Sequence, residues 1–106
     1  HLKHEEVHVM MLDARQHMIS ECLLTKGTVN ASLIAPREIF IHALKANAVG
    51  IILVHNHPSG DDTPSREDLA ATEKVRCAGD LIGIRLLDHI IIGSGHFTSL
   101  CGSWHH

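Results

Sequence analysis

The sequence has few aromatic residues and no excess of positive charge. Among its 106 residues only Phe40, Phe97 and Trp104 are aromatic, and 9 Lys and Arg stand against 12 Asp and Glu. Proteins that bind nucleic acid use basic residues to neutralise phosphates and, for single strands, aromatic rings to stack on bases. Direct binding of nucleic acid is therefore not expected of this chain.

Long hydrophobic runs and paired cysteines are also lacking. No apolar stretch approaches the roughly 20 residues that a membrane-spanning helix needs. The composition, 44% hydrophobic and 20% charged, is typical of a soluble globular protein. Cys22, Cys77 and Cys101 are odd in number and show no C-x-x-C spacing, and no secretory signal pattern opens the chain. These absences predict a cytoplasmic protein with no membrane association.

Histidine, by contrast, is abundant, at 11 of 106 residues. His1 and His4 near one end and His105 and His106 at the other resemble remnants of a purification tag. Only histidines with a metal-like spacing inside an ordered element are therefore informative.

The length and the hydrophobic pattern predict one mixed α/β domain over residues 1–106, with a central mixed sheet flanked by helices. Apolar and β-branched runs predict strands over residues 7–12, 17–25, 48–54, 84–92 and 96–100. Pro36 starts a helix that ends near Asn47, and a second helix starts around Pro64 and Ser65. Gly79 is expected to end that second helix in the left-handed conformation.

Two histidines follow the strand predicted for residues 48–54. His55 and His57 lie two residues apart, so their side chains are expected to point the same way. Asp68 comes 11 residues after His57, behind a loop rich in Gly and Pro, and shares one helical stripe with Ser65, Ala71, Thr72, Val75 and Ala78. That stripe should face the sheet, so Asp68 should point toward the histidines.

Two imidazoles and one carboxylate leave the fourth tetrahedral position of zinc open, as in catalytic zinc sites. Zinc in such a site makes hydroxide available near neutral pH, which implies hydrolysis. Each motif also has a simpler interpretation. Ser65 and Asp68 fit the S-x-x-D capping box, which needs no metal, and an isolated H-x-H is commonly accidental.

The combined motifs resemble a known family. His55-Asn56-His57-Pro58, followed by Ser65 and Asp68, is similar to the JAMM (MPN+) metalloprotease signature, H-x-H-P and then S-x-x-D. The strings V-H-N-H-P-S-G-D-D-T-P-S and L-L-D-H-I-I-I-G resemble the C-terminal domain of the bacterial RadC family, historically labelled a DNA-repair protein. The resemblance covers about residues 5–100 and implies an MPN/JAMM-like domain with a cytidine-deaminase-like architecture.

The resemblance implies that His55, His57 and Asp68 ligate one zinc ion and that Ser65 hydrogen-bonds the oxyanion of the attacked carbonyl. The family also uses a glutamate before the first strand as general base, which points to Glu5 or Glu6. Glu5 is favoured over Glu6. Both faces of the strand are apolar, so the alternation of side chains along it does not decide between these two glutamates. Glu21 and Glu38 are weaker candidates, and an exposed glutamate at this place is otherwise only a solvated charge.

The chain also departs from the family. RadC proteins carry an N-terminal helix-hairpin-helix region, whereas this chain begins almost at its first predicted strand and therefore resembles an excised or truncated domain. The tail at 101–106 does not resemble the family's usual end. Asp88 and His89 interrupt an apolar strand, where they either support the metal from behind its ligands or form a buried pair or strand edge.

Two functions remain open from the sequence. The favoured one is a zinc-dependent metallopeptidase that cleaves a peptide or isopeptide bond in a peptide or protein substrate. The alternative is a DNA-repair or recombination module with a structural or catalytically silent zinc. A zinc nucleotide deaminase is excluded because P-C-x-x-C is absent, and no predicted helix carries H-E-x-x-H. The substrate and the oligomeric state are not legible from the sequence.

Overall fold

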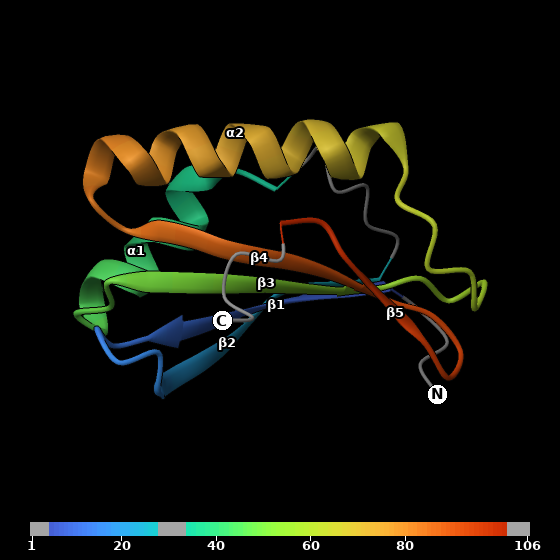
Figure 1. Cartoon of the computed structure of the whole chain (residues 1–106), viewed down its shortest axis with the longest axis horizontal. Helices are drawn as coiled ribbons and strands as arrows, with labels where there is room; N and C mark the ends of the chain where they lie inside the picture. The colour runs from blue at the N-terminus through green and yellow to red at the C-terminus, as the bar shows by residue number, and fades with distance from the viewer. Residues whose placement is uncertain (1–4, 28–33, 102–106) are drawn as a thin grey trace.

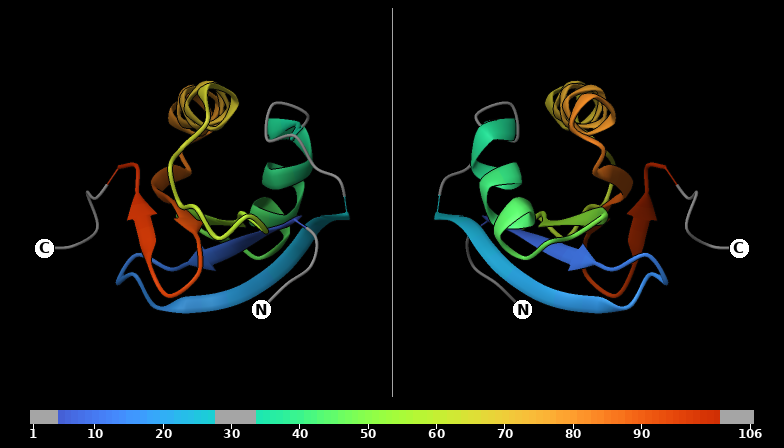
Figure 2. Two further views of the ribbon diagram at one scale, coloured as in Figure 1. Left: turned by 90° about the vertical axis from the view of Figure 1, so that its right-hand side faces the viewer. Right: turned by 90° about the vertical axis from the view of Figure 1, so that its left-hand side faces the viewer.

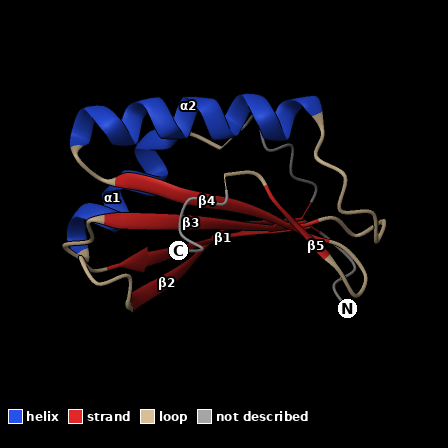
Figure 3. Ribbon diagram, in the orientation of Figure 1, coloured by secondary structure: helices blue, strands red, loops and turns tan. Residues whose placement is uncertain are grey.

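The computed structural model describes residues 5–27 and 34–101 (Figure 1). The terminal histidines and the tail after Cys101 lie outside the described residues. The elements along the chain are β1 (Glu5–Leu12), β2 (Met18–Gly27), α1 (Pro36–Lys45), β3 (Gly50–Asn56), α2 (Arg66–Ile82), β4 (Arg85–Ile92) and β5 (Phe97–Ser99). Figure 3 shows how these helices and strands are arranged.

The strands form one mixed sheet in the order β2-β1-β3-β4-β5. β1 is antiparallel to both β2 and β3, whereas β3 and β4 are parallel. A parallel pair needs a long crossover connection, which α2 supplies, while the adjacent β4 and β5 are antiparallel. The expected mixed α/β domain is confirmed, with observed strand bounds within two residues of the expected ones.

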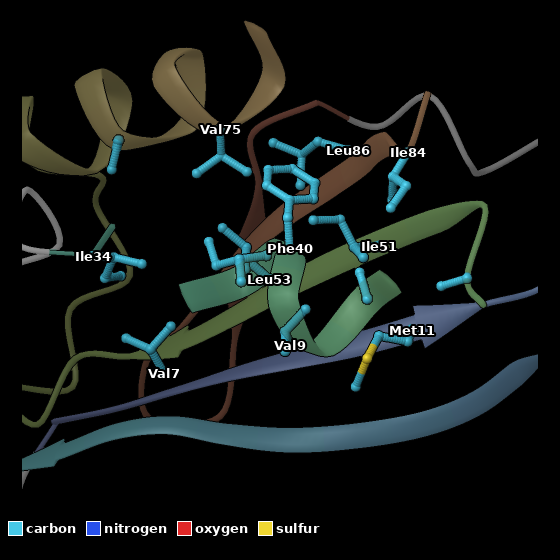
Figure 4. Packing of buried hydrophobic residues seen from close by; sticks show 14 residues of the cluster. Val7, Val9, Met11, Ile34, Phe40, Ile51, Leu53, Val75, Ile84 and Leu86 are labelled. Atoms are coloured by element: carbon cyan, nitrogen blue, oxygen red, sulfur yellow. The ribbon is translucent and has the colours of Figure 1, made fainter. Parts of the chain in front are cut away.

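Both helices lie on the same face of the sheet (Figure 2). Between them and the sheet, buried side chains from β1, β3, β4 and both helices form the main core (Figure 4). The labelled contributors include Met11, Phe40, Ile51, Leu53, Val75 and Leu86. The stripe predicted for α2 is confirmed, because Asp68, Ala71, Thr72 and Val75 are buried. In the described part of the chain, no helix is long and apolar enough to cross a membrane.

The expected end of α2 at Gly79 is wrong. The helix continues to Ile82, and Gly83 takes the left-handed conformation, with φ of 91° and its N–H bonded to the Gly79 carbonyl. Gly79 serves another purpose, since a Cβ atom there would lie 2.2 Å from the backbone oxygen of Ile84 and 3.2 Å from Cζ of Phe40. The glycine allows the helix, the following turn and α1 to approach closely.

Gly79→Ala is therefore expected to destabilise the fold more than Gly83→Ala. The added methyl at Gly79 forces the backbone apart, which should lower the free energy of unfolding by about 2–3 kcal/mol. At Gly83 nothing lies within 4 Å of a Cβ atom, so only the left-handed conformation is penalised, by about 1 kcal/mol. Urea unfolding of the two variants measures the difference, and equal losses would contradict this role for Gly79.

Candidate metal site

The site begins at the carboxyl end of β3, a central strand between β1 and β4. The His55 side chain is 2% exposed. His57 follows the strand, but its N–H still donates to the Ile92 carbonyl at 2.8 Å, which keeps the backbone extended past the strand end. The two rings lie edge to face with centroids 4.9 Å apart. The predicted convergence of the two histidines is what the structure shows.

Asp68 reaches the histidines from the first turn of α2. Its carboxylate is 1% exposed, with Oδ1 3.2 Å from His55 Nδ1 and Oδ2 3.1 Å from His57 Nε2. Asp68 also forms a full capping box, because Oδ2 accepts the Ser65 N–H at 2.8 Å and Ser65 Oγ accepts the Asp68 N–H at 3.0 Å. The two interpretations of S-x-x-D are therefore compatible, since one carboxylate caps the helix and also faces both histidines.

The hydrogen bonds of the rings test whether this group suits a cation. His57 Nδ1 lies 2.9 Å from the Asp61 carbonyl oxygen, which only accepts, so Nδ1 carries the hydrogen. In the neutral ring the lone pair of Nε2 then faces Asp68 Oδ2. His55 Nδ1 has no hydrogen-bond partner among the described residues, despite its short distance from Oδ1. Nitrogen lone pairs that face a buried carboxylate repel it unless a proton or a metal cation lies between them.

One ligand atom from each of His55, His57 and Asp68 lies within 4.8 Å of the other two, so the group could hold a metal ion. Nitrogen from histidine and oxygen from a carboxylate are ligand types that zinc accepts. The Asp61 carbonyl behind His57 is the kind of outer partner that fixes the tautomer of a metal-binding histidine. The residues present therefore fit a divalent metal.

Charges in the site keep Asp68 ionised. Burial alone would raise the pKa of Asp68, but the interactions with His55 and Ser65 outweigh burial and hold this pKa well below its ordinary value. Burial would lower the pKa of His55, but the carboxylates of Asp68 and Glu5 outweigh it and raise that pKa. The cluster thus attracts positive charge into a buried place.

The four candidate glutamates lie in different places. Glu5 shares the helix-covered face of β1 with Val7, and its Oε2 is 3.0 Å from His55 Nε2. Glu6 contacts His8 at 2.9 Å, and Glu21 contacts the other nitrogen of that ring at 3.3 Å. Glu38 is exposed in the first turn of α1. Of these four, the structure brings Glu5 to the histidines.

The predicted hairpin of β4 and β5 is present and holds the loop after His57, a contact that was not predicted from the sequence. The Ser94 N–H donates to the Gly60 carbonyl at 2.9 Å, and Thr98 Oγ1 donates to Asp62 Oδ2 at 2.7 Å. Gly93 permits this contact, because a Cβ atom there would lie 2.3 Å from the Gly60 oxygen. A cavity of about 450 Å³ lies beside His57, between Pro58 and the hairpin turn.

Asp88 and His89 on β4 are both buried. Asp88 accepts hydrogen bonds from Ser99 Oγ and from the N–H groups of His89 and Cys101, so it ties residues 99–101 to β4. His89 instead lies on the site side, where its ring stacks on His55 with centroids 6.1 Å apart. Burial lowers the pKa of His89 to about 4, so its ring is neutral near pH 7.

A five-stranded mixed sheet with two helices and a buried His-His-Asp cluster define a small α/β domain of the JAB type, with a group that could hold a metal ion. A family model described as "RadC-like JAB domain" matches residues 1–104, and the chain belongs to this family. The match confirms the resemblance predicted from the sequence and runs past residues 5–100 at both ends.

Several curated relatives carry the name UPF0758 protein. The chain is similar to "UPF0758 protein GSU0386" of Geobacter sulfurreducens, with 51% identity over 90 residues, which are 85% of this chain and 39% of the relative. It is 46% identical to a relative from Methanococcoides burtonii over 99 residues, 93% of this chain and 43% of that protein. A relative from Thermotoga maritima shows 48% identity over 99 residues, 92% of this chain and 45% of the relative. The chain thus spans less than half the length of the curated relatives it matches.

Proposed function

We propose that this domain is a zinc-dependent hydrolase that cleaves a peptide or isopeptide bond. The observation that carries the proposal is the buried cluster in which nitrogen atoms of His55 and His57 face the ionised carboxylate of Asp68. These three side chains would hold the ion. Zinc bound there would supply a Lewis acid that polarises a carbonyl and makes water acidic near neutral pH.

Glu5 contacts His55, and Ser65 contacts Asp68. In the proposed reaction Glu5 accepts a proton and Ser65 donates a hydrogen bond. Glu5, whose side chain is 27% exposed, lies at the border between the buried histidine and solvent. In the proposed reaction Glu5 accepts a proton from the attacking water and delivers it to the leaving nitrogen. Water then adds across the C–N bond, giving a carboxylic acid and an amine.

Ser65 would stabilise the oxygen of the attacked carbonyl. Its Oγ accepts the Asp68 N–H, and a hydroxyl that accepts one hydrogen bond still has its own proton to donate. A donor aimed at the developing negative charge lowers the barrier of acyl transfer. The capping box holds this hydroxyl on the same turn as Asp68, so the donor and the metal ligand keep a fixed spacing.

A peptide or protein substrate suits the surface beside the cluster. The cavity next to His57 is bounded by Pro58, Ile92 and the turn at 93–95, and none of its lining side chains is acidic or basic apart from His57. Such a wall favours an uncharged extended segment over a phosphate backbone. The charge balance of 9 Lys and Arg against 12 Asp and Glu also disfavours nucleic acid.

The test uses protein from which His1, His4, His105 and His106 have been removed, so that terminal histidines bind no metal. Elemental analysis should find about one zinc per chain, as expected for a three-residue site of this type. Hydrolysis of peptide and isopeptide substrates should stop when a chelator removes the zinc and return when zinc is added. Absence of stoichiometric zinc, or tight sequence-specific DNA binding in place of hydrolysis, would contradict the proposal.

A further inference from the structure

A buried chain of hydrogen bonds connects β4 to the turn that carries Asp68. His89 Nδ1 lies 2.6 Å from Thr72 Oγ1, and Thr72 Oγ1 lies 2.7 Å from the Asp68 carbonyl oxygen. His89 is 0% exposed and Thr72 is 9% exposed. These contacts join two elements that are otherwise linked through the apolar core.

The direction of each hydrogen bond follows from the groups involved. The Asp68 carbonyl only accepts, so the single hydroxyl proton of Thr72 is donated to it. Thr72 Oγ1 must then accept the second bond, and the donor is His89 Nδ1–H. The neutral His89 ring therefore has its hydrogen on Nδ1 and its lone pair on Nε2.

This tautomer leaves one ring nitrogen of His89 without a hydrogen-bond partner in the described part of the chain. His89 Nε2 is buried and has no hydrogen-bond partner within residues 5–27 and 34–101. A buried acceptor without a partner is unfavourable, and an apolar side chain would fill the same place at lower free energy. The fold alone therefore gives no reason for a histidine here, whereas the contact with Thr72 does.

We propose that His89 is a positioning residue of the metal site, which acts through Thr72 to fix the backbone of Asp68 and through ring stacking to orient His55. The stacked rings are inclined by 20° with centroids 6.1 Å apart. His89 thus supports two of the three ligands from behind. This inference rests on the proposed zinc function.

Two substitutions of His89 distinguish a positioning role of its side chain from a role in packing alone. His89→Leu fills the site but removes the donor, whereas the side-chain amide of His89→Asn places an N–H close to the position of Nδ1. Outer partners of metal ligands commonly contribute 10-fold to 100-fold in metal affinity. We expect zinc affinity, measured by competition with a chromophoric chelator, to fall about 10-fold to 100-fold in His89→Leu and by less than about 5-fold in His89→Asn.

Substitutions of Thr72 test the same series of hydrogen bonds. Thr72→Val should weaken zinc binding as His89→Leu does, whereas Thr72→Ser, which keeps the hydroxyl, should bind zinc nearly as wild type does. The double variant Thr72→Val/His89→Leu should lose no more affinity than the weaker-binding single variant, because both substitutions break the same series of hydrogen bonds. In the metal-free protein, the amide hydrogens of the first turn of α2 should exchange faster in His89→Leu than in wild type. The exposed His17→Leu is the control and should change neither quantity.

The outcomes distinguish this inference from the proposed function. If wild type fails to bind zinc, both are overturned. If wild type binds zinc and His89→Leu binds it equally well, only the positioning role is overturned. Equal losses in His89→Leu and His89→Asn would also overturn it, because the donated hydrogen bond would then not matter.

Discussion

Replacing Asp68 by alanine is expected to abolish tight zinc binding. Asp68 is the only acidic member of the cluster and lies within 3.2 Å of both histidines, so its loss removes a ligand and the negative charge that balances the metal. Since outer partners alone change affinity by 10-fold to 100-fold, loss of a direct ligand should lower zinc affinity by more than about 100-fold. Chelator competition on the protein without its terminal histidines measures the loss.

The same substitution also removes half of the capping box, so stability needs separate control. Loss of a helix cap is expected to lower the free energy of unfolding by about 1 kcal/mol. Asp68→Asn keeps an oxygen that accepts the Ser65 N–H, so it should unfold near wild type yet still bind zinc weakly. Asp80→Ala, on the exposed face of α2, should change zinc affinity little. Full zinc retention in Asp68→Ala would rule out the proposed ligand set.

The second large effect is expected at Glu5. Glu5→Gln keeps the size of the side chain and its contact with His55 but cannot accept a proton, so hydrolysis should slow by about 100-fold to 10,000-fold. Zinc content should stay near that of wild type, because Glu5 is outside the group that would hold the ion. The measurement is the steady-state rate on a peptide substrate with zinc content determined in the same samples.

Glu6→Gln is the matched control for this prediction. Glu6 is the next residue on β1 but points to the opposite face, where it contacts His8. Its substitution should leave the rate of hydrolysis within about 2-fold of wild type, because the group is not placed to transfer a proton at the site. A large loss in Glu6→Gln with little loss in Glu5→Gln would assign the base to Glu6 instead.

Much of the fold could be predicted because its signals are local. Alternating or continuous apolar runs marked the strands, Pro36 marked the start of α1, and the stripe of small side chains on α2 predicted that Asp68 faces inward. The end of α2 was misplaced, because a glycine required for close packing and a glycine required for a left-handed turn look the same in a sequence. The short distance between Gly79 and Ile84 and the φ of 91° at Gly83 distinguish them.

The sequence by itself determined the ligand candidates, because strand periodicity predicts that His55 and His57 point the same way and helix periodicity predicts that Asp68 faces the sheet. Tertiary structure decided which glutamate joins them, because the face of β1 covered by helices depends on how distant elements pack. It also supplied partners that carry no sequence signal, such as the Asp61 carbonyl behind His57 and the Thr72 hydroxyl beside His89. Backbone groups and long-range hydrogen bonds acquire their positions only when the chain folds, so no local pattern records them.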